Sequence, residues 1–222
     1  MSDLLPLVEV ETGANPDAAI IWLHGLGADG HDFEALVPAL TLKQGLQVRF
    51  VFPHAPHRPV TINGGMEMRA WYDILEMTLE RKVDMENIHE SAQQIEDLIE
   101  DQISKGIATD RIVLAGFSQG GVIAYQVALH TPHKLAGVMA LSTYLVNHEN
   151  ITSAQFCPNG KTPILIHHGS QDPIVAPSLG VQAEQLLSAK GYEVRYQSYP
   201  MPHAVCPEQV TDISAWLNER LA

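Results

Sequence analysis

The sequence predicts an α/β fold: a mostly parallel central sheet with helices on both faces. Short apolar, β-branched segments alternate along the chain with longer segments of helical periodicity. Most of the apolar segments end in Gly, Pro or His, and 222 residues can bury a sizeable core without a metal or a disulfide. Because repeated strand-then-helix order implies right-handed crossovers, helices should cover both faces of the sheet. We expect one domain over residues 1–222.

The individual elements follow from this alternation. The segments typical of buried parallel strands are 19–23, 48–52, 111–115, 136–141, 163–167 and 194–199. The segments with helical periodicity are 32–40, 87–104, 120–130, 179–189 and 207–221. Residues 87–104 show this periodicity best, since isoleucines recur on one face and acidic residues on another. In such sheets ligands bind at the carboxyl ends of the strands, so catalytic residues should directly follow strand segments.

Composition excludes several classes of partner. The chain has 13 basic and 26 acidic residues, a net charge of −13, which disfavours nucleic acid and anionic lipid surfaces. No apolar stretch approaches the roughly 20 residues that span a bilayer, so we expect no stable membrane insertion. The first residues lack a signal-peptide pattern, which predicts a cytoplasmic protein. Cys157 and Cys206 lie far apart in the sequence, so we expect two free thiols and no metal site.

A serine stands between a strand and a helix in "LAGFSQGGVIA", residues 114–124. Its surroundings, Gly116-Phe117-Ser118-Gln119-Gly120, have the G-x-S-x-G form of a nucleophile elbow, where small residues let strand and helix approach closely. The helix N-terminus would direct N–H groups toward an oxyanion near Ser118. Alone, the pentapeptide is more typical of a glycine-rich turn between strand and helix, so the prediction of a nucleophile depends on its partners.

A base and an acid for Ser118 follow by elimination. In this arrangement they come later in the chain, in the order Asp or Glu, then His. His203, in "SYPMPHAV", is the only histidine beyond position 168. Among the intervening acids, only Asp172, in "LIHHGSQDPIV", directly follows a strand. Either residue alone would be an ordinary loop residue, but the joint pattern predicts a Ser118, Asp172 and His203 triad.

The reaction also needs donors for the oxyanion. The glycine-rich loop in "IIWLHGLGADG" can direct the Leu26 backbone N–H into the site, and the Gln119 N–H at the helix start is the second candidate. His24 could act as a base, but we expect it to brace this loop by hydrogen bonding. His167 and His168 are interpreted as loop packing, because no third ligand completes a metal spacing.

Together these motifs resemble the phospholipase/carboxylesterase family of α/β-hydrolases, which includes the acyl-protein thioesterases. The matching stretches lie between residues 22 and 203 and comprise "WLHGLGADG", "FPHAP", "AWYDI", "RIVLAGFSQGG", "LST", "HHGSQDPIV" and "YPMPH". The resemblance implies an α/β-hydrolase fold without a separate cap domain, the same triad and backbone donors, and no cofactor. The family commonly has glycine before the catalytic histidine. Here Pro202 restricts φ, so we expect a stiffer or shifted loop.

The substrate prediction concerns "NGGMEMRAWYDILEMTLE", residues 63–80, which is crowded with apolar side chains that include Met77 and Leu79. These side chains either pack locally or form an adaptable wall for an acyl chain. The resemblance to the family favours substrate binding for Trp71 and Leu75.

The sequence therefore predicts a serine carboxylesterase that hydrolyses short- to medium-chain acyl esters or thioesters of small molecules through an acyl-enzyme. One alternative is an acyl-protein thioesterase or lysophospholipase with a fatty-acyl substrate. Others are a peptidase or lactone hydrolase on the same fold, and a noncatalytic ligand-binding relative. Exposed apolar residues leave a homodimer open.

Overall fold

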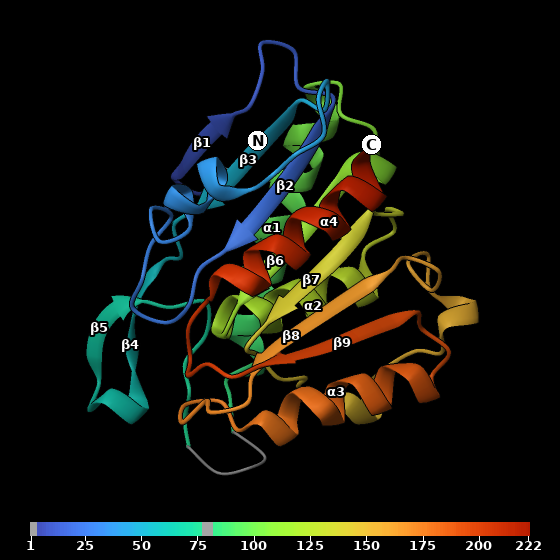
Figure 1. Ribbon diagram of the computed structural model, residues 1–222. Helices are drawn as coiled ribbons and strands as arrows, with labels where there is room; N and C mark the ends of the chain where they lie inside the picture. The colour runs from blue at the N-terminus through green and yellow to red at the C-terminus, as the bar shows by residue number, and fades with distance from the viewer. Residues whose placement is uncertain (1–3, 77–81) are drawn as a thin grey trace.

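A single seven-stranded sheet organises the molecule (Figure 1). The computed structural model describes residues 4–76 and 82–222, so Met77 and Leu79 of the apolar segment lie outside the described residues. The strand order is β1-β3-β2-β6-β7-β8-β9, with β1 antiparallel to β3 and the remaining neighbours parallel. The strands are β1 Leu7–Glu11, β2 Ala18–Leu23, β3 Val48–Pro53, β6 Ile112–Phe117, β7 Gly137–Leu141, β8 Ile164–Gly169 and β9 Val194–Tyr199.

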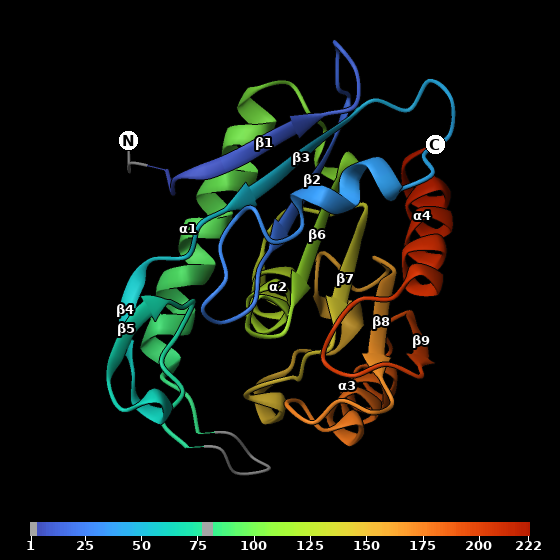
Figure 2. The same ribbon diagram turned by 60° about the vertical axis from the view of Figure 1, so that its left-hand side comes forward.

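Helices cover both faces of this sheet, as Figures 1 and 2 show. The helices are α1 Met85–Ser104, α2 Gln119–His130, α3 Pro177–Ala189 and α4 Pro207–Leu221. Side chains of α1, α2 and α3 pack with one set of strand residues, and side chains of α4 pack with the other set. In β2, for example, Ile21 faces α1 and α2 while Ile20 and Trp22 face the opposite layer, which is the two-residue alternation of a strand. The predicted α/β architecture is confirmed.

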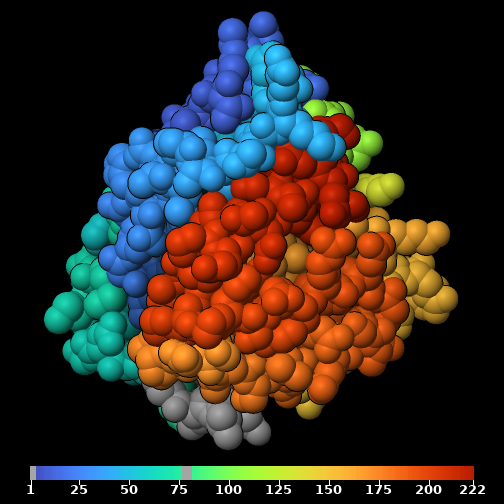
Figure 3. Space-filling view, in the orientation of Figure 1, coloured from blue at the N-terminus to red at the C-terminus, as the bar shows by residue number. Residues whose placement is uncertain are grey.

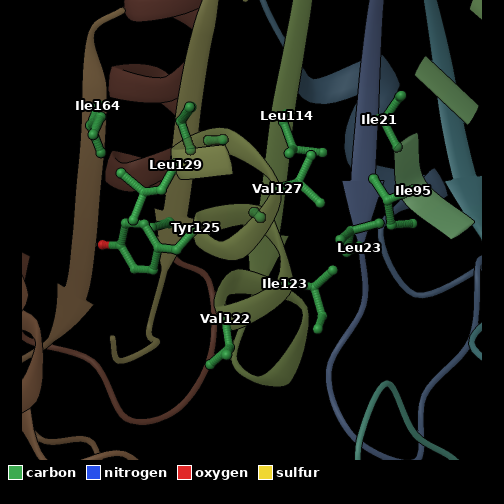
Figure 4. Close-up of a cluster of buried hydrophobic side chains, with 14 of the residues drawn as sticks. Ile21, Leu23, Ile95, Leu114, Val122, Ile123, Tyr125, Val127, Leu129 and Ile164 are labelled. Carbon is green, nitrogen blue, oxygen red and sulfur yellow. The ribbon is translucent and has the colours of Figure 1, made fainter. Parts of the chain in front are cut away.

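Figure 4 shows the core between α2 and the sheet, where Val127 lies beside Leu114 and Leu129 lies near Tyr125 on the side of Ile164. Helix α2 is buried along most of its length, since it packs against β2, β6 and β7 of the sheet and against its neighbour α1. The opposite side of the sheet is covered by the C-terminal segment, which Figure 3 shows in red across the front of the molecule. Among the described residues no helix has the length and apolar character needed to cross a membrane.

Two features differ from the sequence-based expectations. Residues 32–40 do not form an α-helix but a short 3₁₀ helix, Glu34–Ala39, because Pro38 lacks the N–H that an α-helical turn needs. The strands β1, β4 His57–Val60 and β5 Met66–Arg69 were not predicted. All three are largely half-buried or exposed, so they lack the continuous apolar runs of the central strands.

The hairpin of β4 and β5 stands beside the main sheet, at the end toward which the parallel strands point (Figures 1 and 2). It leads directly into the apolar segment around Trp71. This placement brings that segment to the carboxyl ends of the strands, where the predicted catalytic residues also lie.

Candidate active site

Ser118 occupies a strained turn between β6 and α2, with φ 53° and ψ −118°. A non-glycine residue with positive φ costs about 1–3 kcal/mol and persists only where its surroundings hold it. Here the Ser118 N–H donates to the Leu141 carbonyl at 2.9 Å, and the Thr143 hydroxyl donates to the Ser118 carbonyl at 2.6 Å. The turn therefore holds the Ser118 hydroxyl at the carboxyl end of β6.

The glycines of the elbow are required by close backbone approaches. A Cβ atom on Gly116 would lie 2.2 Å from the Gly120 carbonyl oxygen. A Cβ atom on Gly120 would lie 2.5 Å from the carbonyl oxygen of Leu23 on the neighbouring strand β2. Strand β6, helix α2 and the end of β2 can meet at this point only because neither residue has a side chain.

His203 bridges Ser118 and Asp172. Its Nδ1 lies 2.6 Å from Asp172 Oδ2, and its Nε2 lies 2.9 Å from Ser118 Oγ. Because a carboxylate oxygen accepts hydrogen bonds, Nδ1 donates to Asp172 and Nε2 is left to accept from the Ser118 hydroxyl. The ring of Phe117 packs against the imidazole, with 4.7 Å between centroids. The three residues predicted from separate strand ends are thus connected by two hydrogen bonds.

The Asp172 carboxylate is held by the turn in which it lies. Its Oδ1 accepts from the backbone N–H groups of Ile174 at 2.8 Å and Val175 at 2.9 Å, while Oδ2 faces His203. The side chain is buried. Both oxygens therefore have fixed roles, one in forming the turn and one in orienting the imidazole.

The loop that carries His203 is tied to the Asp172 turn. Ser170 N–H donates to the Tyr199 carbonyl at 2.7 Å, and Gln171 N–H donates to the Met201 carbonyl at 3.1 Å. Although a proline at position 202 predicts a stiffer or shifted loop, His203 reaches both Ser118 and Asp172. Pro202 lacks a backbone N–H, but these two hydrogen bonds use the carbonyl groups of Tyr199 and Met201 as acceptors, so the proline does not interrupt them.

The two segments that carry the predicted oxyanion donors both lie next to the nucleophile. Gly25 passes so close to Ser118 that a Cβ atom there would lie 3.5 Å from Ser118 Cβ. The loop around Leu26 is fixed because Gly27 N–H donates to the Arg69 carbonyl at 2.9 Å. Gln119 is the first residue of α2, and the first four N–H groups of a helix have no intrahelical acceptor. The arrangement can present two N–H groups to an oxyanion formed at Ser118.

His24 braces this loop, which confirms that expectation. The Ala55 N–H donates to His24 Nε2 at 3.0 Å, so Nδ1 carries the proton and donates to the Gly25 carbonyl at 2.7 Å. Burial lowers the pKa of His24 to about 4. The imidazole is therefore neutral near pH 7 and serves as a hydrogen-bonding link.

His167 and His168 have packing roles, but they lie buried within strand β8 and not in a loop as expected. The His168 Nε2 bonds the Val175 carbonyl at 2.9 Å, and the His167 ring meets the edge of the Tyr199 ring with centroids 5.0 Å apart. Burial lowers the pKa of both histidines, that of His167 to about 4. The part of the chain that the structure describes contains no cluster of three or more side chains suited to a metal ion. Cys157 and Cys206 are unpaired, as expected.

The position of Trp71 corrects the expectation that it forms part of an acyl-facing wall. Its side chain is 0% exposed and lies in the core, and its indole N–H donates to the His24 carbonyl at 2.9 Å. The indole thus has no surface to offer to a substrate and is instead part of the support of the glycine-rich loop. Leu75 is half-buried and retains an accessible surface.

Two contributions to the site were not predicted. Thr143 holds the Ser118 carbonyl, and the Gln119 side chain bonds the backbone of residues 71 and 72. Two sequence signals point to Thr143: it follows the strand segment 136–141, and "LST" is one of the stretches that resemble the family, but neither shows what its side chain bonds. A glutamine inside an elbow motif carries no signal of its side-chain partner, because that partner is 47 residues away in the chain.

Comparison with known proteins gives a consistent set of relatives. A family model described as phospholipase/carboxylesterase matches residues 6–221. Acyl-protein thioesterase 1 of Neurospora crassa is 40% identical over 97% of this chain and 92% of that protein. The protein of the same name from Gibberella zeae is 36% identical over 92% of this chain and 91% of that protein.

Solved structures give similar matches. The crystal structure of Zea mays acyl-protein thioesterase 2 has a TM-score of 0.87 with 26% identity, covering 98% of this chain and 100% of that chain. Arabidopsis thaliana SOBER1 has a TM-score of 0.82 with 28% identity, covering 92% of this chain and 99% of that chain.

Proposed function

The chain belongs to the phospholipase/carboxylesterase family and is a hydrolase of the esterase and thioesterase type, and we propose that it cleaves fatty-acyl thioesters with Ser118 as nucleophile. The observation that carries the proposal is the 2.9 Å contact between Ser118 Oγ and His203 Nε2. A serine hydroxyl becomes an effective nucleophile at neutral pH only when an adjacent base removes its proton. His203 is in place to do so, with Asp172 fixing its tautomer.

The proposed reaction proceeds in two halves. His203 takes the Ser118 proton as Oγ forms a bond to the acyl carbonyl carbon, and the N–H groups of Leu26 and Gln119 stabilise the oxyanion. The bond to the leaving sulfur or oxygen then breaks, and His203 donates its proton to the leaving group. This leaves an acyl-Ser118 ester. His203 then activates a water molecule that hydrolyses this ester, releasing the carboxylic acid and restoring the serine.

The relatives support a fatty-acyl thioester of a protein cysteine as the substrate class, rather than the short- to medium-chain esters of the main sequence-based prediction. Relatives that are 34–40% identical to this chain are named acyl-protein thioesterase 1. Oxygen esters remain substrates of the same chemistry, because the tetrahedral intermediate is similar for both leaving groups. We propose Leu75, which is half-buried, as a residue that contacts the acyl chain.

Covalent labelling tests the nucleophile. A fluorophosphonate should add one label to the wild-type protein and none to Ser118→Ala, with intact mass as the measurement. Ser188→Ala is a matched control, since this exposed serine lies on α3 and its hydroxyl donates to the Glu184 carboxylate. Labelling of Ser118→Ala, or no labelling of the wild type, contradicts the assignment. The second result would favour a noncatalytic ligand-binding protein.

Substrate class is tested separately by hydrolysis. Acetyl, octanoyl and palmitoyl groups are compared as thioesters of one S-acylated peptide and as oxygen esters of one alcohol. We expect kcat/KM to rise with chain length and the thioesters to be cleaved at least as fast as the oxygen esters. A preference for acetyl oxygen esters would restore the carboxylesterase interpretation, and turnover of amides or lactones alone would indicate the peptidase or lactonase alternative.

A further inference from the structure

Trp71 is held from three sides by hydrogen bonds that no step of the proposed reaction uses. Its backbone N–H donates to Gln119 Oε1 at 2.8 Å, its carbonyl accepts from the Ser91 hydroxyl, and its indole N–H donates to the His24 carbonyl at 2.9 Å. The side chain is fully buried. Such a network in a low-dielectric interior fixes geometry, because each lost partner leaves a buried polar group unpaired.

One end of this network is the residue after the nucleophile. The Gln119 side chain is 2% exposed, and its amide spans two backbone groups: Oε1 accepts from Trp71 N–H, and Nε2 donates to the Tyr72 carbonyl at 2.6 Å. The same residue supplies one of the two proposed oxyanion donors through its backbone N–H. The start of α2 is thereby tied to residues 71 and 72.

The other end is the loop that carries the second donor. The Trp71 indole bonds the His24 carbonyl, two residues before Leu26, and the Arg69 carbonyl accepts from Gly27 N–H, one residue after it. The loop is thus attached on both sides of Leu26 to the segment 69–72. The His24 ring also packs against the Trp71 ring, with 5.2 Å between centroids.

We propose that the Gln119 side chain and the Trp71 indole are positioning residues that set the separation between the two oxyanion donors. The hydrogen bonds run from Gln119 through Trp71 to His24, and so join two elements that the chain order places far apart. The inference rests on the proposed function, because it concerns the donors of that reaction. Donors stabilise an oxyanion only at about 2.7–3.1 Å, so a small displacement of either lowers the rate of acylation.

Trp71→Phe tests this role, because it removes the indole N–H and keeps an aromatic ring in the core. We expect the acylation rate constant, measured from the burst of p-nitrophenol, to fall about 10- to 100-fold, within the range of a misplaced catalytic group. The factor should be equal for acetate and octanoate esters, with KM little changed. If the acylation rate constant falls only for the octanoate ester, Trp71 contributes to acyl binding instead. If it is unchanged for both esters, Trp71 does not position the oxyanion donors.

Trp22→Phe is the matched control. Trp22 is also fully buried and lies two residues before His24, yet its indole N–H meets no acceptor among the residues that the structure describes. The same atoms are deleted and a similar gap is left in the core, but no hydrogen bond is lost, so acylation should stay near the wild-type rate. Equal losses of acylation in the two variants would show that a packing defect, and not the hydrogen bond, slows the reaction.

A double-mutant cycle tests whether the hydrogen bonds of Gln119 and Trp71 act together on the oxyanion donors. Gln119→Met removes the amide while keeping length and the backbone N–H. If both residues set the same separation, Trp71→Phe combined with Gln119→Met should lose little more than the worse single variant. If the two losses multiply, the two residues act independently, and the proposed connection from Gln119 through Trp71 to His24 is wrong.

The proposed function and this inference fail in different ways. If the wild type shows no acylation at Ser118, the proposed function is wrong. If the wild type is acylated normally and Trp71→Phe behaves like Trp22→Phe, only the positioning role is wrong.

Discussion

Asp172 shows how a single side chain can serve the fold and the chemistry with different atoms. Its Oδ1 closes the turn by accepting from Ile174 and Val175, and its Oδ2 orients His203. A substitution that keeps the turn but replaces the acceptor facing His203 by a donor would therefore isolate the contribution of this carboxylate to catalysis.

Asp172→Asn is that change. The amide oxygen can still accept from the turn, but the NH₂ group would face His203 Nδ1 and force the proton onto Nε2, where it can no longer accept from Ser118. We expect kcat for a p-nitrophenyl ester to fall about 10³- to 10⁴-fold, as the wrong tautomer does in serine proteases. Asp212→Asn is the control. The Asp212 carboxylate accepts a hydrogen bond of 2.7 Å from the Tyr199 hydroxyl and takes no part in the hydrogen bonds of the triad. A loss below tenfold in Asp172→Asn would argue against a role for this carboxylate.

At the scale of residues, the sequence predicted those site members that directly follow strands. Ser118, Asp172 and His203 could be identified because strand ends in a parallel sheet converge on one edge. The burial of Trp71 could not, since the segment that carries it has neither strand alternation nor helical periodicity. The apolar content of that segment fits a core and a substrate wall equally well, and only its hydrogen bonds to Gln119 and His24 decide between them.

At the scale of elements, the site depends on how closely β2, β6 and α2 approach one another. The first turn of α2 lies against the last carbonyls of β2, and a Cβ atom on Gly120 would be 2.5 Å from the Leu23 oxygen and 2.6 Å from the His24 oxygen. Backbone atoms in a central strand cannot move aside as a flexible side chain can. The distance between helix and strand is therefore set by the absence of a side chain at this position.

Gly120→Ala should separate these elements. In a solvent-exposed helix the substitution would be stabilising, by about 0.5–1 kcal/mol. Here overpacking should instead lower the unfolding free energy by about 1–3 kcal/mol, and acylation should slow because the His24 carbonyl is displaced. Urea denaturation and burst kinetics measure the two effects. Gly13→Ala is the control, since the atoms nearest to a Cβ there belong to the flexible side chain of Gln47. A Gly120→Ala protein as stable as the wild type would mean that the close approach is not required.

The elements themselves were predictable where burial is complete or strictly one-sided. The central strands and the helices α1 and α4 follow from apolar runs and from the 3.6-residue period, and their observed ends lie within about two residues of the predicted ones. The hairpin β4–β5 was not predictable in this way. Only one of the four residues of β4 and none of β5 is buried, so hydrophobicity leaves no pattern there.

At the scale of the whole molecule, the acid stability of the protein should depend on histidines buried in the neutral form. Burial lowers the pKa of His24 and of His167 to about 4, whereas an unfolded histidine titrates near 6.5. Between pH 6.5 and 4 the unfolded chain therefore binds protons that the folded protein does not, and the folded state loses stability as the pH falls. Above pH 6.5 both states are neutral at these positions, and this contribution to stability is fully present.

The unfolding free energy should decrease by about 1.4 kcal/mol per pH unit for each such histidine within that window. Urea denaturation at pH 7 and at pH 5 measures the change. His167→Gln should reduce the dependence of the unfolding free energy on pH by about 1.4 kcal/mol per pH unit, the contribution of one proton, and leave the contribution of His24. Trp22→Phe provides the comparison, because it should lower stability at both pH values by the same amount. An unchanged slope in His167→Gln would mean that His167 is protonated to the same extent in the folded and unfolded states. The acid sensitivity would then have to arise elsewhere in the molecule, with the bond from Ala55 to His24 as the next position to test.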